Sequence, residues 1–342
     1  ALRYPPSSFF SLPSFLFLLP SLMPELPEVE TIRRGLAATL PGCRVSRVAR
    51  GGFDVVRCRG RAPRLLADDR IAEVFRHGKQ LALIGRTGET LCLHLGMSGS
   101  LRLADPADSI DAHTHLRWRI DPPDAPDTPG TGAAQASPAR ELRFRDPRRF
   151  GGVWQYATKQ ALCMDRWSRL GPDALRVGPA TLERRLAGRT LALKAALLDQ
   201  HTLAGLGNIY VDELLFACRL HPLRPAGSLS RGELESLVRR MRGLLQRAIE
   251  AGGSTLRDYV GADGAAGGFR LSHRAYGREG ERCRRRGCPG SIRRTIVAAR
   301  STFTCPACQP GLAYTVGSRA GSAHHAVLLN QTDRWAGAIN RR

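Results

Sequence analysis

Residues 23–30 read Met-Pro-Glu-Leu-Pro-Glu-Val-Glu. A proline at a chain start, followed directly by a glutamate, would present a secondary amine beside a proton carrier. Such a pair can attack a sugar carbon and move its proton. Here 22 residues precede Met23, so the Pro24 nitrogen is a tertiary amide with no lone pair for attack. The stretch therefore predicts a nucleophile that can act only as the first residue of the chain.

A helix begins within the same stretch. Val29, Ile32, Leu36 and Leu40 recur at helical spacing, and Pro41-Gly42 ends the run. Short β-type runs follow at 45–48, 71–75, 81–84, 91–95 and 116–120. The pattern predicts a sheet-rich domain over 23–157 with one buried N-terminal helix.

The second half of the chain has a helical pattern. Candidate helices cover 182–200, 208–220 and 230–251, with Asn208 and Ser230 as plausible N-caps. They predict a helical domain over 165–262. Two stretches interrupt the order. Residues 121–140 hold five prolines and no large apolar side chain, and 261–268 is Gly-rich, so both predict flexible loops.

Charge narrows the class of partner. The 342 residues include 52 Lys+Arg against 30 Asp+Glu, a formal net charge of +22. Such a positive charge attracts polyanionic partners, with nucleic acid as the first candidate. The alternative is an Arg-rich composition on a solvated surface. Hydrophobic residues make up 42%, which is enough for real cores.

Cysteines gather at the C-terminal end. Of nine, five are scattered, while Cys283 and Cys288 are followed, after 16 residues, by Cys305 and Cys308. An odd, uneven set in a long chain indicates a reducing compartment with one metal site. Two close pairs separated by a hairpin-length spacer predict a zinc ribbon over 270–309, with one structural Zn2+ bound by four thiolates. The alternative is four unligated cysteines.

The two ends of the chain read differently from the rest. Residues 1–22 are apolar and rich in Ser and Pro, their apolar runs are too short to span a bilayer, and only Arg3 is basic. They predict a disordered extension from a misplaced start, with a targeting segment as the alternative. Residues 310–342 have weak periodicity and predict a disordered tail.

Eight segments carry a resemblance to a known family. In this order, they are similar to formamidopyrimidine-DNA glycosylase, the bacterial enzyme that removes oxidised purines. They lie at 24–36, 77–83, 94–102, 146–152, 170–175, 197–216, 252–260 and 300–309. The resemblance implies an α+β multidomain fold. It combines a β-sandwich with a buried N-terminal helix, a helix–two-turns–helix DNA-binding domain and a C-terminal zinc ribbon.

The resemblance also implies catalytic roles. Pro24, freed by removal of Met23, matches the family's nucleophile, and Glu25 matches its general acid. Lys79 matches a residue that contacts phosphate and gives a proton in β-elimination. Arg300 matches the zinc-finger arginine that grips the lesion phosphates in δ-elimination. Glu28 reads as a structural carboxylate at the helix start, where the helix dipole favours negative charge.

Further matches concern DNA. An enzyme that flips a nucleotide out of the stack must fill the gap. Met97 lies in a Gly-Met-Ser-Gly turn, and Arg148 and Phe150, two apart, can point the same way on an extended strand. Outside this family, Met97 and Phe150 read equally well as core residues. The remaining positions that match DNA contacts are His113, Arg189, Lys194 and Asn208, with Lys194 and the backbone near Gly207 expected at a phosphate.

The activity that the resemblance implies is a bifunctional glycosylase and AP lyase for 8-oxoguanine and formamidopyrimidines. Its partner would be double-stranded DNA carrying oxidised purines or abasic sites. It would act as a monomer in the bacterial cytoplasm, associated with the nucleoid, with no membrane partner and no redox cofactor or catalytic metal. Two alternatives stay open. One is an endonuclease VIII-like glycosylase for oxidised pyrimidines, and the other is a non-catalytic DNA-binding protein if residues 1–22 are retained.

One departure from the family pattern concerns the metal site. The first cysteine pair has two residues more than the usual spacing, so the zinc knuckle must be wider.

Overall fold

A computed structural model describes residues 23–51, 55–58, 63–123, 139–254 and 268–311. The expectations for the extension over 1–22, for the bulk of the 121–140 insertion, for the 261–268 loop and for the tail beyond residue 311 lie outside these residues. The described part combines two β-sheets, a set of helices and a C-terminal hairpin, so the predicted mixed α+β fold is confirmed.

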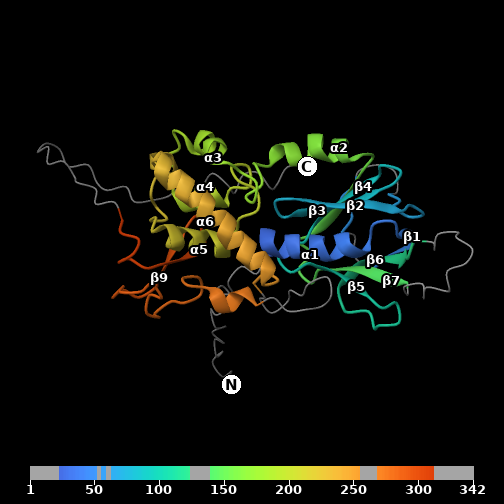
Figure 1. The fold of residues 1–342 in the computed structure, drawn as a ribbon. Coiled ribbons are helices and arrows are strands. Elements are labelled where there is room, and N and C mark those ends of the chain that lie inside the picture. The colour runs from blue at the N-terminus through green and yellow to red at the C-terminus, as the bar shows by residue number, and fades with distance from the viewer. Residues whose placement is uncertain (1–22, 52–54, 59–62, 124–138, 255–267, 312–342) are drawn as a thin grey trace, which may run out of the picture. The chain divides into compact units, whose positions relative to one another are not determined.

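Helix α1 (Leu26–Thr39) is the buried N-terminal helix that the sequence predicts. It starts at a capping box, in which the Glu25 side chain accepts from the Glu28 backbone and the Glu28 side chain accepts from the Glu25 backbone. Its apolar side chains pack against β2, β3 and β5, while α6 contacts it as well (Figure 1). The helix therefore joins the sheets to the helical part of the chain.

Eight strands form two four-stranded antiparallel sheets, ordered β1-β6-β7-β5 and β2-β3-β4-β8. Their inner faces share one apolar core, which includes Trp118 and Phe144. Strands β5, β7 and β8 are additions to the predicted set. The bounds are β1 Arg44–Arg50, β2 Ile71–His77, β3 Gln80–Gly85, β4 Thr90–His94, β5 Ser100–Ala104, β6 Thr114–Asp121, β7 Arg140–Arg145 and β8 Gly152–Tyr156.

The register of the strands brings four connections to one end of the sandwich. In one sheet Gln80 and Gly152 both pair with His94, and in the other Ser100 and Thr114 both pair with Arg145. The turns β2–β3, β4–β5 and β7–β8 and the loop before β6 therefore meet at the same edge. The matched segments 77–83, 94–102 and 146–152 lie there.

The helical part contains α2 (Lys159–Asp165), α3 (Pro179–Leu186), α4 (Leu193–Leu198), α5 (Asn208–Cys218) and α6 (Arg231–Glu250). Short 3-10 turns cover Trp167–Arg169, Ala226–Ser228 and Phe269–Ser272. Within the described ranges, no helix is long and apolar enough to cross a membrane.

Helix boundaries confirm one prediction and correct two. Ser230 caps α6 and forms a capping box with Glu233, as expected of a Ser N-cap. The expected single helix over 182–200 is two helices, because Gly188 takes a left-handed conformation (φ 69°) that a helix cannot continue through. Asn208 is not an N-cap, since Gly207 occupies that position and Asn208 is the first helical residue.

The C-terminal hairpin consists of β9 (Arg293–Val297) and β10 (Arg300–Thr304). Val297 pairs with Arg300, so only Ala298 and Ala299 form the turn. Both have positive φ, 51° and 56°, as a two-residue hairpin of type I′ requires. This left-handed conformation costs an L-residue about 1–2 kcal/mol.

We expect Ala299→Gly to stabilise the hairpin. Glycine removes the left-handed strain, and its larger entropy in the unfolded chain offsets only part of the gain, leaving about 0.5–1 kcal/mol. Thermal unfolding and hydrogen exchange over 293–304 measure the effect. Ala38→Gly, at an exposed position of α1, is the matched control and should destabilise the protein. A lower hairpin stability in Ala299→Gly would contradict the strain argument.

Candidate functional site

A cavity of about 250 Å3 lies where α1, the β2–β3 turn, α5 and the C-terminal hairpin meet. Glu25, Lys79 and Arg300, three of the four predicted catalytic residues, line it together. Pro24, the fourth, is buried between Met23 and Glu25, which both line the cavity. Residues that are far apart in sequence therefore line one cavity with the two neighbours of Pro24.

Glu25 is held by the N-terminus of α5. Its Oε2 accepts a hydrogen bond from the Gly207 N–H at 2.6 Å, and its Oε1 accepts one from the Ile209 N–H at 3.0 Å. A helix N-terminus favours negative charge, so this is an anion site filled by a side chain of the same protein. The expected phosphate contact at the Gly207 backbone is therefore corrected: that N–H binds Glu25.

Position 207 must be glycine for this contact. A Cβ atom there would lie 2.4 Å from the Glu25 Cδ and 2.7 Å from the Lys79 Nζ. Both distances are shorter than any contact a Cβ can make, so the absence of a side chain lets the carboxylate approach the helix.

Burial dominates the proton affinity of Glu25. Burial raises the pKa of the carboxyl group from 4.5 to about 7. The negative charge of Glu28 raises it as well, while Lys79 and the two backbone N–H groups lower it. A group with a pKa near neutrality is present in both protonation states there. Glu25 can therefore both donate and accept a proton near neutral pH.

Lys79 is buried in the β2–β3 turn. Burial lowers the pKa of its ammonium group, the nearby Arg300 lowers it further, and Glu25 and Glu28 oppose the shift. The ammonium group therefore releases a proton more readily than an exposed lysine does. A lysine in this state can serve as a proton donor and acceptor beside the cavity.

A buried ionic network holds the turn that carries Lys79. Asp173 accepts from the Gly78 N–H at 2.9 Å and from the Arg76 Nη1 at 2.6 Å. The Arg76 Nε donates to the Glu30 Oε2 at 2.9 Å, which connects the turn to α1. Asp173 and Arg76 were not predicted as functional residues. The only sequence signal for Asp173 is its place in the matched segment 170–175.

Glu28 behaves as the structural carboxylate expected at the helix start. Its Oε2 accepts from the Glu25 N–H at 2.9 Å, and its Oε1 accepts from the Tyr210 hydroxyl and the Ser254 N–H, both at 2.7 Å. The Ser254 hydroxyl in turn lies 2.9 Å from the His273 Nε2. Glu28 thus joins α1 to α5 and to the chain after α6.

Two further cavity residues were not predicted, although both lie in matched segments. Gln80 lines the cavity, and its Oε1 accepts from the Arg166 Nε at 2.8 Å and from the Trp167 Nε1 at 2.9 Å. His94, its cross-strand partner, also lines the cavity, and burial lowers the pKa of its imidazole to about 4. His94 is therefore neutral at physiological pH.

The three residues expected to fill the gap left by a flipped nucleotide lie on two neighbouring connections. Met97 is half-buried in the β4–β5 turn, and Phe150 is 59% exposed after β7. The Arg148 guanidinium lies 5.4 Å from the centre of the Phe150 ring. The segment is a turn with Arg149 at φ 57°, so the expected extended strand is corrected.

Asp146 ties these two connections together. Its Oδ1 accepts from the Ser98 hydroxyl at 2.9 Å, and its Oδ2 accepts from the Gly151 N–H at 2.7 Å. The Ser98 Oγ also accepts from the Arg148 N–H at 3.1 Å. Asp146 has no exposed surface and was not predicted from the sequence. It fixes Met97 and Arg148 relative to each other.

The remaining expected DNA contacts have separate positions. His113 is exposed, with φ 67°, in the loop before β6. Arg189 follows α3, and its Nη1 lies 3.7 Å from the Asp199 Oδ2. Neither lines the cavity. Asn208 does, and its Nδ2 donates to the Ser301 carbonyl at 2.9 Å.

Lys194 does not have the position expected of a phosphate contact. Its side chain is completely buried, and its Nζ donates to the Asp212 Oδ1 at 2.6 Å and to the Ser301 carbonyl at 3.0 Å. The expectation of a phosphate contact is corrected, because a group without exposed surface and with an internal counter-ion cannot reach a DNA backbone.

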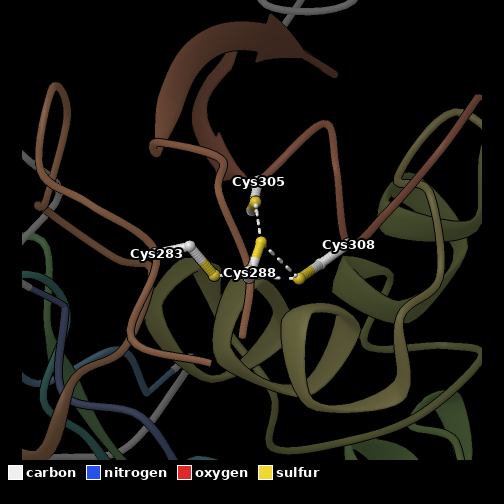
Figure 2. Close-up of side chains that lie close together, drawn as sticks. All are labelled: Cys283, Cys288, Cys305 and Cys308. Atoms are coloured by element: carbon white, nitrogen blue, oxygen red, sulfur yellow. Dashed lines mark hydrogen bonds between the residues drawn. The ribbon is translucent and has the colours of Figure 1, made fainter. Parts of the chain in front are cut away.

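The four predicted metal ligands come together at the base of the hairpin (Figure 2). The sulfur atoms of Cys283, Cys288, Cys305 and Cys308 all lie within 4.8 Å of one another, and the contacts among them are 3.3–3.7 Å. Tetrahedral zinc with Zn–S bonds of about 2.3 Å places its sulfurs roughly 3.8 Å apart, so the cluster fits that geometry. The wider first pair does not prevent this approach.

Strand β10 connects the cysteine cluster to the cavity. Strand β10 begins at Arg300, which lines the cavity, and ends at Thr304, the residue before Cys305. The hairpin therefore extends from the cysteines to the cavity and carries Arg300 there.

Comparison with known proteins gives the same family for both halves of the described chain. Residues 23–153 match the formamidopyrimidine-DNA glycosylase N-terminal domain, and residues 170–260 match the formamidopyrimidine-DNA glycosylase H2TH domain. The formamidopyrimidine-DNA glycosylase of Phenylobacterium zucineum is 42% identical over 299 residues, which cover 84% of this chain and all of the relative.

Two solved structures are similar in fold. The Fpg (MutM) protein of Thermus thermophilus is 39% identical, with a TM-score of 0.70, covering 84% of this chain and 98% of that one. A Lactococcus lactis Fpg mutant in complex with Fapy-dG-containing DNA is 30% identical, with a TM-score of 0.72, covering 84% of this chain and all of the other. With the catalytic candidates, the sandwich, the H2TH helices and the cysteine cluster in place, this chain belongs to the formamidopyrimidine-DNA glycosylase family.

Proposed function

We propose that the protein is a base excision repair enzyme that removes oxidised purines from double-stranded DNA and then cleaves the abasic strand. One observation carries this proposal: in a member of this family, Glu25, Lys79 and Arg300 line one cavity together with Met23, the residue before Pro24. The Fapy-dG DNA bound to the Lactococcus lactis relative supports the same substrate class.

Base excision follows from the proline amine. Once Pro24 is the first residue, its secondary amine attacks C1′ of the damaged nucleotide, and the bond from C1′ to the base breaks. Glu25, protonated in part near neutral pH, supplies the proton that the leaving group or the opening sugar requires. The product is an iminium between Pro24 and the sugar.

Strand cleavage follows from the iminium. It acidifies the C2′ proton, and loss of that proton expels the 3′ phosphate in β-elimination. A second elimination expels the 5′ phosphate. Lys79, with its lowered pKa, suits the proton transfers, and Arg300, exposed at the hairpin, suits the phosphates. Met97, Arg148 and Phe150 supply the apolar and cationic groups for the gap in the stack.

Zn2+ is the metal that the cysteine cluster fits best. Four thiolates fill a tetrahedral shell and leave no open position, so the ion would hold the hairpin and take no part in the chemistry. We assign the zinc ribbon to residues 270–309, the helix–two-turns–helix domain to 165–262 and the catalytic sandwich to 23–157. The bacterial relatives and the DNA substrate support action at the nucleoid in the cytoplasm.

The N-terminus tests the proposal directly. A chain that begins at Pro24 should form a borohydride-trapped cross-link with a duplex carrying 8-oxoguanine, because its amine is free. The same chain with residues 1–23 should not cross-link, because its Pro24 nitrogen is an amide. N-terminal sequencing of the native protein shows which form exists. Absence of trapping by the Pro24 form would contradict the proposal, and faster turnover of thymine glycol would favour the oxidised-pyrimidine alternative.

We expect the excision rate to fall on both sides of neutrality. At acid pH the Pro24 amine, with an ordinary pKa of about 8, is protonated and inert. At alkaline pH Glu25, with its pKa near 7, loses the proton that it must donate. Glu25→Gln should lower single-turnover excision by about 100-fold or more and should remove the alkaline decline. An unchanged alkaline limb in this variant would show that another group donates the proton.

Removal of the metal should detach the hairpin from DNA. We expect the purified enzyme to hold one Zn2+ by elemental analysis, and Cys305→Ser to lower both zinc content and affinity for a lesion duplex. Cys163→Ser, at a cysteine outside the cluster, is the matched control and should change neither. Full duplex affinity in zinc-free Cys305→Ser would contradict a structural role for the ion.

A further inference from the structure

A buried ion pair in the helical part has no role in the chemistry above. Lys194 on α4 and Asp212 on α5 meet at 2.6 Å, with side chains 0% and 1% exposed. Both lie outside the residues that line the cavity. A buried pair is costly to desolvate, so it is weak evidence for stability and better evidence for fixing one arrangement of the chain.

The pair binds one edge of the C-terminal hairpin. The Lys194 Nζ donates to the Ser301 carbonyl at 3.0 Å, and the Asp212 Oδ2 accepts from the Phe303 N–H at 3.0 Å. Arg300, Thr302 and Thr304 alternate with these residues along β10, which pairs with β9 on its other edge. The ion pair thus satisfies backbone groups that a two-stranded sheet leaves without a strand partner.

The contacts lie directly beside a candidate catalytic residue. Ser301 follows Arg300 in the chain, and its carbonyl receives a second hydrogen bond, from the Asn208 Nδ2, at 2.9 Å. Arg300 itself is exposed and is not part of any ion pair among the described residues. Its position is therefore set through the backbone of the next residue, and much less by its own side chain.

The cysteine cluster alone does not fix this position. Cys305 anchors the far end of β10, five residues from Arg300. Five residues of strand span about 16 Å, so a small change in the angle of the hairpin at the cysteines moves Arg300 by a large distance. A second point of attachment near Arg300 removes that freedom.

We propose that Lys194 and Asp212 are positioning residues, which lock β10 onto α4 and α5 so that Arg300 is held at the cavity for the second, δ-elimination step. This inference rests on the proposed function. Neither residue touches the substrate. The pair acts through the Ser301 carbonyl and the Phe303 N–H, and its loss should spare the formation of the iminium at Pro24.

The test uses a neutral double variant of the Pro24 form, Lys194→Met with Asp212→Asn. Removal of only one charge would leave the other buried and unpaired, whereas the double change removes both and keeps an acceptor for the Phe303 N–H. The matched control is Lys159→Met with Glu73→Gln, which removes an exposed ion pair of 3.0 Å. Lys194→Gln with Asp212→Asn is a second variant that fills the space with two amides, in case the first folds poorly.

Two measurements on an abasic duplex separate the steps: borohydride trapping reports formation of the iminium, and the ratio of β- to δ-elimination products reports the second elimination. The zinc content of the purified variant shows whether the cysteine cluster is intact. We expect the double variant to keep its zinc and its trapping and to accumulate the β-product. The δ step should slow by about 10- to 100-fold, as a displacement of about 1 Å at a catalytic group can cause. The control should match the wild type.

Combination with Arg300→Ala distinguishes positioning from general damage. If the pair acts through Arg300, the double variant should slow δ-elimination no further once Arg300 is absent. Multiplied losses, or a product ratio equal to that of the wild type, would overturn the inference. Hydrogen exchange of the hairpin amides over 293–304 gives a readout without catalysis, and unchanged protection throughout the hairpin in the variant would also overturn it. A wild-type Pro24 form that traps no DNA would count against the proposed function instead.

Discussion

The structure depends on one contact between a carboxylate and a helix. Glu25 accepts from the Gly207 and Ile209 N–H groups at the start of α5, which seats the first turn of α1 on the helical part of the chain. The contact satisfies N–H groups that a helix always leaves free, and it places an acid beside Pro24 in a buried site. Burial in turn brings the pKa of Glu25 near neutrality. This one contact thus joins α1 to the helical part of the chain and holds the Glu25 carboxyl group where burial raises its pKa.

Buried polar groups extend this arrangement in three directions. Asp173 and Arg76 hold the turn that carries Lys79, and Asp146 joins the connections that carry Met97 and Arg148. The Lys194–Asp212 pair secures β10 beside Arg300. Each support is an ionic or hydrogen-bonded group that has almost no exposed surface. Lys79, Met97, Arg148 and Arg300 are therefore set on supports with almost no exposed surface, which keep their positions fixed without a large apolar contact of their own.

Sequence patterns predicted the helices and strands well, but they did not predict the contacts between those elements. The α1 and α6 helices, five strands and the cysteine hairpin follow from periodicity and spacing, which act within a few residues. Lys194 shows what such patterns cannot supply. The resemblance of its segment placed Lys194 at a phosphate, and only its approach to Asp212, a residue 18 positions away, shows that it is internal. Asp146 was likewise missed, because its partner Ser98 is distant in sequence. Arg148 and Phe150 were expected to point the same way, as on an extended strand, because their spacing of two is visible in the sequence while a left-handed Arg149 is not.

The two ends of the β-sandwich differ in how freely the connecting segments can vary. The connections that carry Lys79, Met97 and Arg148 all meet at one end, while β6 leaves at Asp121 and β7 returns at Arg140, at the opposite end of the same sheet. Ile120 pairs with Arg140, so the strand ends lie side by side whatever joins them. The pairing that positions the other end of the sandwich therefore does not depend on the chain between Asp121 and Arg140. The connection between β6 and β7 is suited to a reporter domain or to natural growth of the chain, since neither alters the register at the opposite end of the sheet or adds a residue before Pro24.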